Sequence, residues 1–236
     1  MHEWAIYLLL AAAAMAAYML KKLSIAGSIA GWLTASMLLY SNGRVALGCM
    51  ALFFVAGTAA TALHDKHKSG RQPHATRSIA NVLSNTTGVW VASLLRLLLP
   101  ENHFSPEMGL LAVAVSQATA LSDTLSSELG QLYGKQCYSI LGFRRVTPGE
   151  DGGISRAGLL AGLGGSLLMA VYMSFFISQY RLLLLLVAVS WAGNLLDSLL
   201  GATWQKQGLL NNHGVNALSN LLTTLAFLFM LRLIGY

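Results

Sequence analysis

The stretch Leu182–Gln205 reads LLLLLVAVSWAGNLLDSLLGATWQ, and it decides the class of the fold. Its first half is continuously apolar, and the run Leu182–Leu200 has the length needed to cross a bilayer, roughly 17 to 25 residues. Its second half places Asn194, Asp197 and Gly201 on one helical face. A face of polar and small residues is the reverse of a lipid-facing one, so it predicts either hydrogen-bonded helix packing or a ligand site.

The rest of the chain is similarly apolar. Of its 236 residues, 55% are hydrophobic and only 10% are charged, whereas a soluble domain carries roughly 25% charged residues. We therefore predict an all-α fold, a polytopic integral membrane helix bundle of about eight transmembrane helices. Residues 1–63 form N-terminal transmembrane helices without motifs, and residues 64–236 form a motif-bearing membrane catalytic domain. The other predicted spans are Trp4–Leu20, Ile25–Tyr40, Val45–Leu63, Ile79–Leu99, Pro106–Leu125, Ala157–Ser178 and Val215–Ile234.

The distribution of basic residues predicts the orientation. Eleven of the 15 lysines and arginines fall on one side of this scheme, in or beside the long loops, and four fall on the other. Because cytoplasmic loops carry the excess of lysine and arginine, we expect a multi-pass protein of the cell membrane with both termini outside. The net charge of +6 then reflects these loops, and no nucleic-acid partner is expected. Cys49 and Cys137 imply no disulfide framework.

An internal repeat is indicated at an offset of 74 residues. Val115–Leu125 and Val189–Leu199 share Val, Ser, Ala, Leu, Asp, a hydroxyl residue and Leu in register. A second pair of similar segments is Asn81–Asn85 and Asn216–Asn220. Paired segments of equal orientation are typical of parallel repeats about an axis along the membrane normal. Such a repeat would gather around one cytoplasmic-side cavity Asp123, Asp197, Asn81, Asn85, Asn216 and Asn220.

The stretch Ser122–Gly130 concentrates two carboxylates and four hydroxyls at a predicted helix end. Asp123 and Ser127 lie one turn apart, as do Thr124 and Glu128, so the group can share a face. Oxygen ligands of this kind suit Mg²⁺, which usually takes one or two carboxylates and shares the phosphates of a substrate. A capped helix end with Glu128 in water is the alternative.

The stretch Val146–Ser155 is the most polar and glycine-dense part of the chain. It contains a Pro-Gly turn and two consecutive glycines that allow a positive φ, and Ser155 is expected to cap the next helix. Bare N–H groups, a helix N-terminus and the preceding Arg144 and Arg145 are suited to holding phosphate. A plain connection between helices is the alternative.

Two further patterns predict structure without a ligand. Small residues at four-residue spacing over 157–166 predict close helix packing. His64–Lys68 is expected to be a solvated or headgroup-facing loop, because its basic residues disfavour a bound cation. The remaining polar groups favour phosphoryl transfer, which needs mainly positioning and charge neutralisation. The residues alone therefore indicate a membrane-embedded enzyme acting on a lipid phosphate with a cytosolic nucleotide.

Three ordered motifs resemble those of one integral membrane family. They are Ser122-Asp123-Thr124 with Ser127-Glu128-Leu129-Gly130, then Pro148-Gly149-x-Asp151-Gly152-Gly153-Ile154-Ser155, then Asp197-Ser198-Leu199-Leu200-Gly201-Ala202-Thr203-x-Gln205 followed by Asn212 and Asn216. The family includes transmembrane protein 19 and the plant phytyl-phosphate kinase, and the resemblance covers about residues 77 to 236. Thr86, Leu125 and Glu150 depart from its pattern.

The resemblance implies a kinase that transfers the γ-phosphate of CTP or ATP to a prenyl monophosphate, with Mg²⁺, at the cytoplasmic face. It implies catalytic roles for Asp123, Glu128 and Asp197, and metal binding by Asp123, Asp151 and Asp197. It implies phosphate or nucleotide binding by Arg144, Arg145, Gly149, Asp151, Gly152, Gly153 and Ser155. The supporting polar residues would be Asn81, Asn85, Asn194, Asn212 and Asn216.

Other functions stay open at this point. A CTP-dependent cytidylyltransferase or a lipid-alcohol kinase has similar Asp-Ser-x-x-Gly helices. A transporter or flippase for lipid or isoprenoid phosphates also suits repeats and polar residues near helix ends, but its polar groups should continue through the midplane. The expected partners are a prenyl phosphate, a nucleotide and membrane lipids, and the sequence leaves open whether the chain forms a homo-oligomer.

Overall fold

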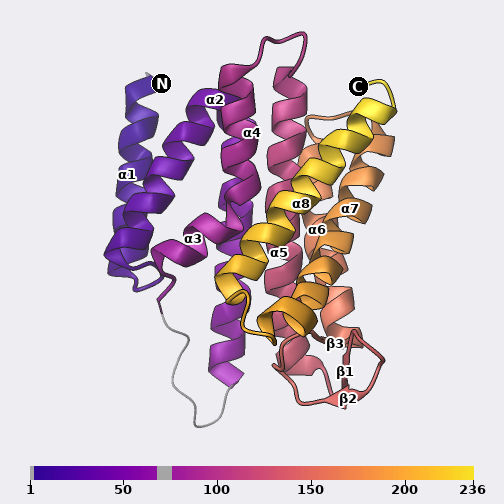
Figure 1. The fold of residues 1–236 in the computed structure, drawn as a ribbon. Coiled ribbons are helices and arrows are strands. Elements are labelled where there is room, and N and C mark those ends of the chain that lie inside the picture. Colours follow the sequence, from indigo (N-terminus) through magenta and orange to yellow (C-terminus); the bar gives the residue numbers. More distant parts are fainter. Residues whose placement is uncertain (1–2, 68–75) are drawn as a thin grey trace.

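The computed structural model describes residues 3–67 and 76–236 of the chain. These residues form a helical bundle with a small three-stranded sheet at one end (Figure 1). Five of the described helices are long and apolar enough to cross a membrane, while α1 and α4 are shorter. The predicted helical membrane fold is confirmed, and the number of spans stays a prediction. The elements are α1 Glu3–Met19, α2 Ile25–His67, α3 Ile79–Asn85, α4 Thr87–Leu98, α5 Pro106–Tyr133, β1 Cys137–Ser139, β2 Arg145–Val146, β3 Gly153–Ser155, α6 Arg156–Ser174, α7 Tyr180–Leu200, the π-helix η1 Gly201–Gln205 and α8 Asn212–Leu233.

Helix α5 is the centre of the bundle. It packs against α2, α4, α6, α7 and α8, and its residues from Leu111 to Val115 are fully buried. Its sequence alternates small and branched apolar residues with Ser116, Gln117 and Thr119, which are also buried. A helix that is buried all round belongs inside a bundle, so the polarity of α5 reflects its place among helices.

Helix α2 consists of two arms that fold back at Gly43. Gly43 has φ 81° and ψ −171°, which breaks the helix, and a positive φ is a conformation that glycine adopts without strain. The arms lie side by side, since Gly27 on the first and Gly57 on the second both lie against Arg77. The two spans predicted within residues 25–63 are therefore a helical hairpin, whose second arm continues as far as His67.

The single helix predicted over Ile79–Leu99 is wrong, because the chain breaks at Thr86 into α3 and α4. Three side chains at the break donate to backbone carbonyls one turn earlier: Asn85 to Asn81, Thr86 to Val82 and Thr87 to Leu83. Such local bonds compete with the regular helical pattern. The result is a short α3 inclined to α4 (Figure 1).

Helices α5 and α6 approach closely through small residues, as the spacing over 157–166 predicts. A methyl group added to Gly158 would crowd the backbone of Ser126, and one added to Gly162 or Gly165 would crowd Ser122. Only residues without a side chain allow this separation, and small-residue interfaces of this kind are common between membrane helices. The close packing fixes α6, and the β3 strand before it, against the lower part of α5.

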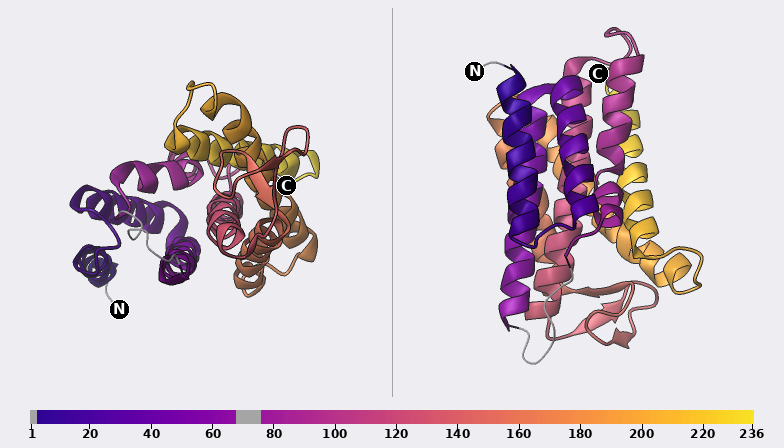
Figure 2. Two further views of the ribbon diagram at one scale, coloured as in Figure 1. Left: turned by 90° about the horizontal axis from the view of Figure 1, so that it is seen from below. Right: turned by 90° about the vertical axis from the view of Figure 1, so that its left-hand side faces the viewer.

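The glycine-rich stretch is part of a sheet with strand order β2-β1-β3, both pairings antiparallel. The sequence predicts this stretch to be a loop, but its two ends pair with β1. Strand β1 has only three residues, which is too short to give a recognisable pattern in the sequence. The N-cap prediction is confirmed, because Ser155 Oγ accepts the Gly158 N–H at 3.0 Å. The sheet covers one end of α5 and α6 (Figure 2), and both chain termini lie at the opposite end (Figure 1).

Candidate active site

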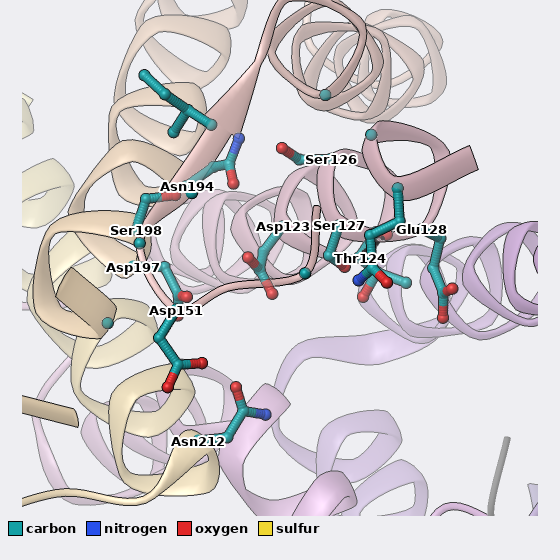
Figure 3. Close-up of a pocket in the computed structure, with 18 of the residues that line it drawn as sticks. Asp123, Thr124, Ser126, Ser127, Glu128, Asp151, Asn194, Asp197, Ser198 and Asn212 are labelled. Carbon is teal, nitrogen blue, oxygen red and sulfur yellow. Dashed lines mark hydrogen bonds between the residues drawn. The ribbon is translucent and has the colours of Figure 1, made fainter. Parts of the chain in front are cut away.

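A polar pocket of about 380 Å³ opens at the sheet end of the bundle. Its walls come from α2, α3, α5, α6, α7, η1, α8 and the turn before β3, and Figure 3 shows residues from α5, α7, α8 and the turn. Most of the residues singled out in the sequence line it. They are Asn81, Asn85, Asp123, Glu128, Gly149, Asp151, Gly152, Gly153, Ser155, Asn194, Asp197, Asn212 and Asn216.

Asp123 and Asp197 approach the pocket from two different helices, α5 and α7 (Figure 3). One oxygen of Asp197, Oδ2, accepts a hydrogen bond from Ser219 Oγ at 2.9 Å. The same oxygen lies 3.2 Å from the side-chain nitrogen of Asn216, in the amide orientation that satisfies both groups. Helix α8 thus orients Asp197 through Oδ2, and no described residue donates a hydrogen bond to its other oxygen.

The carboxylate of Asp123 receives no hydrogen bond from the described parts of the chain, although Asp123 is partly buried and lines the same pocket as Asp197 and Glu128. Carboxylates that share one pocket, such as those of Asp123 and Asp197, repel each other when both are ionised. Among the described lining residues there are five carboxylates and one guanidinium. An anionic substrate could enter such a pocket only together with cations.

The fit to Mg²⁺ follows from these donors. Within residues 3–67 and 76–236, no three acidic, histidine or cysteine side chains are grouped as a complete metal cage. Mg²⁺ does not need one, because it usually binds through one or two carboxylates and takes its other ligands from water and substrate phosphates. Asp123 and Asp197 supply such a pair, and Asp151 lines the same pocket from the sheet side (Figure 3).

The turn between β2 and β3 is held against η1. Gly152 has φ 72°, and a methyl group there would collide with Ala202. Beside it, Lys206 Nζ donates to Glu150 Oε1 at 2.6 Å, and this bond lowers the pKa of the Glu150 carboxyl. Glu150, which departs from the family pattern, therefore holds the turn against the end of η1.

Glu128 makes contacts that the sequence did not predict. It is buried, its Oε1 accepts from Thr61 Oγ1 at 2.7 Å, and its Oε2 lies 2.6 Å from His64 Nδ1. The prediction of a solvated loop at His64–Lys68 is wrong for residues 64–67, because the second arm of α2 continues helically to His67 and packs His64 against α5. Lys68 lies outside the described residues. Both oxygens of Glu128 thus hold α2 beside the pocket; its catalytic role stays a prediction.

The basic residue in the pocket wall is Arg77, whereas Arg144 and Arg145 are exposed on the far part of the β1–β2 hairpin. Neither arginine lines the pocket, so their contact with a phosphate stays a prediction. The sequence analysis includes Arg77 only in the charge distribution and does not predict it as a site residue. The feature that could have identified Arg77 is its position directly before the capping box Ser78-x-x-Asn81, which fixes the start of a pocket-lining helix.

One protein family and several known proteins are similar to this chain. A model of the integral membrane protein family DUF92 matches residues 8–224. An uncharacterized membrane protein of Methanocaldococcus jannaschii is 32% identical over 83% of this chain and 80% of its own length. Protein VTE6, chloroplastic, of Arabidopsis thaliana is 29% identical over 90% of this chain and 66% of its own length. Protein PGR of the same plant is 34% identical over 43% of this chain and 48% of its own length. No solved structure matches.

Proposed function

Because the chain belongs to the DUF92 family of integral membrane proteins, we propose that it is a membrane-embedded phosphotransferase acting on a prenyl monophosphate. It transfers the γ-phosphate of CTP or ATP to that lipid and releases the prenyl diphosphate. The observation that carries the proposal is the pocket in which Asp123 and Asp197 meet the glycine-rich turn. The motif resemblance to the family of the plant phytyl-phosphate kinase supplies the substrate class.

The residues of the pocket divide into three groups by chemistry. The turn from Gly149 to Gly153 and the α6 N-terminus at Ser155 line the pocket, and backbone N–H groups of this kind suit phosphate oxygens. Within the turn, the N–H groups of Glu150 and Gly153 already donate to the carbonyls of Thr147 and Glu150. Asp123 and Asp197 would hold Mg²⁺, which neutralises phosphate charge when bound. Five asparagines line the same space and can orient phosphates by donating amide hydrogens: Asn81, Asn85, Asn194, Asn212 and Asn216.

The proposed reaction is an in-line displacement. A phosphate oxygen of the prenyl monophosphate forms a bond to the γ-phosphorus, and the bond between that phosphorus and the β–γ bridging oxygen breaks. The electron pair leaves with the nucleoside diphosphate. The attacking oxygen is already ionised near neutral pH, so no side chain has to remove a proton. The task of the pocket is therefore positioning and charge neutralisation.

The test is an assay of the purified protein in detergent with Mg²⁺, γ-labelled CTP or ATP, and phytyl or geranylgeranyl monophosphate. We expect labelled prenyl diphosphate and an equal amount of nucleoside diphosphate. Asp123→Asn and Asp197→Asn should each lower the rate by about 100-fold or more. The matched control is Glu101→Gln, which removes a carboxylate from the exposed loop before α5, outside the pocket lining. Thermal melting should show that all three variants fold.

The outcomes separate the proposal from its rivals. Release of pyrophosphate would indicate nucleotidyl transfer, and phosphorylation of a prenyl alcohol instead of the monophosphate would indicate a lipid-alcohol kinase. Movement of prenyl phosphate across vesicles without nucleotide consumption would indicate a flippase. Unchanged rates in either aspartate variant would also overturn the proposal.

A further inference from the structure

A second cavity lies directly behind one wall of the polar pocket. It has a volume of about 50 Å³ and lies between the two arms of α2 and helix α3. Three residues line both spaces: Arg77, Asn81 and Asn85. The rest of the second cavity is mostly apolar, with walls from Leu23, Met50, Phe53, Phe54 and Val82. We call this space the α2–α3 crevice.

Arg77 is fixed at the border between the two spaces. Its backbone N–H donates to the Lys22 carbonyl at 3.1 Å, and its carbonyl accepts the Ser24 N–H at 3.0 Å. Its guanidinium carbon lies 5.9 Å from the centre of the Phe53 ring, on the crevice side. Arg77 also lines the polar pocket, as does Glu128. A planar guanidinium with five donors is the side chain best suited to a phosphate.

We propose that the α2–α3 crevice is the acceptor-lipid subsite, in which Arg77 binds the lipid monophosphate and the crevice receives the first carbons of its prenyl chain. The inference rests on the proposed function and specifies which wall the lipid approaches. Asn81 and Asn85 add amide donors at the same border. Its occupant is an isoprenoid phosphate, since only a ligand with an apolar chain attached directly to a phosphate matches an apolar crevice that ends at a guanidinium.

The size of the crevice has a consequence for specificity. At about 50 Å³ it holds only a few carbons, so the rest of a long chain must lie in the bilayer alongside α2 and α3. Met50, Phe54 and Val82 are only partly buried, which is compatible with an opening toward lipid. The subsite should therefore recognise the phosphate and the adjoining isoprene unit and discriminate weakly among chain lengths.

The kinetic test narrows the crevice. Val82→Phe adds bulk to its wall, whereas Leu83→Phe adds the same ring to the neighbouring residue of α3, which is 42% exposed and lines neither space. Val82→Phe should raise the KM for prenyl monophosphate roughly tenfold and leave the KM for nucleotide unchanged. Leu83→Phe should change neither. Equal effects of the two variants on the lipid KM would overturn the subsite, as would a rise in the nucleotide KM alone.

A binding test is independent of turnover. A prenyl monophosphate with a photoreactive diazirine on its first isoprene unit is crosslinked to the purified protein, and the labelled peptides are identified by mass spectrometry. We expect labels on the second arm of α2, near Met50 and Phe54, or on α3 near Val82. Arg77→Gln should reduce labelling by the phosphate probe to the level of the matching prenyl alcohol. Labels confined to α6 or α7, or no effect of Arg77→Gln in a folded variant, would overturn the inference.

The two tests distinguish the inference from the proposed function. If the wild-type protein transfers no phosphate but the probe labels the crevice in a phosphate-dependent way, the lipid subsite stands and the kinase proposal fails. If transfer occurs and the labels fall elsewhere, the kinase stands and the subsite fails.

Discussion

At the scale of single residues, Gly152 is the position of the glycine-rich turn at which an added side chain would collide most closely with the rest of the protein, at Ala202. Its positive φ is one constraint, and its contact with Ala202 of η1 is a second, independent one. Gly142, in the β1–β2 turn, has φ 74° but open space around it. A comparison of variants at the two glycines therefore separates the effect of backbone strain from the effect of the contact between the turn and η1.

We predict that Gly152→Ala lowers phosphotransfer strongly, because the turn must move away from η1 and carry Asp151 with it. Gly142→Ala should cost only about 1 kcal/mol of stability from backbone strain and leave the rate unchanged. Steady-state rates and thermal melting in detergent measure both effects. Equal losses of activity in the two variants would contradict the role of the Gly152–Ala202 contact.

Glu150 gives the turn a dependence on pH. The hydrogen bond from Lys206 lowers the pKa of Glu150 below its ordinary value of 4.5. A carboxyl whose pKa is depressed by folding contributes stability above its unfolded pKa, and this contribution is lost as pH falls through the folded pKa. The turn should therefore be fastened at pH 7 and loosen below about pH 4.5.

Hydrogen–deuterium exchange of residues 147–153 measures this loosening. Protection in the wild type should fall as the pH is lowered from 5 to 3, after correction for intrinsic exchange rates. In Glu150→Gln, protection should be low and independent of pH across the same window. The β1 strand serves as the internal control, and a flat profile for the wild-type turn would exclude the Lys206–Glu150 tether.

At the scale of elements, the first turn of α4, just after the break, is bound by a side chain far away in the sequence. Asn220 of α8 accepts the Gly88 N–H and the Ser116 hydroxyl, each at 2.8 Å, through its Oδ1. Its Nδ2 donates to the Ser116 carbonyl at 2.9 Å. The internal repeat predicts that Asn220 lies at the cavity, but Asn220 does not line the pocket. Its hydrogen bonds direct its side chain toward the junction of α4, α5 and α8 instead.

Asn220→Ala should lower the free energy of unfolding by about 2 to 4 kcal/mol, because it leaves buried polar groups on α4 and α5 without partners. Chemical or thermal unfolding in detergent measures the loss. Asn102→Ala, on the exposed loop before α5, is the matched control and should change little. A stable Asn220→Ala variant would show that the junction does not depend on this amide.

The elements also show how far the sequence could predict the site. Asp123, Asp197 and Ser155 were identifiable, because a polar residue at an apolar helix end or a cap position carries a local signal. The break at Thr86 could not be predicted, since the apolar run continues through it. The side chain that binds the Gly88 N–H just after the break, Asn220, lies on another helix. The Glu128–His64 contact was missed for the same reason: it exists only after α2 and α5 have packed.

At the scale of the whole molecule, the pocket and the termini lie at opposite ends of the bundle (Figure 1). The charge distribution predicts that the pocket end faces the cytoplasm, and that orientation stays a proposal. A nucleotide is a cytosolic substrate, so the proposed function requires the same orientation.

Labelling of introduced cysteines tests the orientation in intact cells. With Cys49 and Cys137 replaced by serine or alanine, Asn102→Cys should react with a membrane-impermeant maleimide added from outside. Thr147→Cys, on the turn beside the pocket, should react only after the cells are permeabilised. Reversed labelling would place the pocket outside and argue against a nucleotide-dependent enzyme.

The distribution of the pocket residues along the chain also bears on how the protein is made. The wall begins at Thr61 and is completed by Asn212 and Asn216 at the start of α8, and Asp197 receives its hydrogen bond from Ser219 on that same helix. During synthesis, helices emerge from the N-terminus first. A nascent chain that has inserted every helix through α7 therefore still lacks the groups that orient Asp197. Catalytic competence would arrive only with the last helix, so incompletely translated chains in the membrane would be inactive.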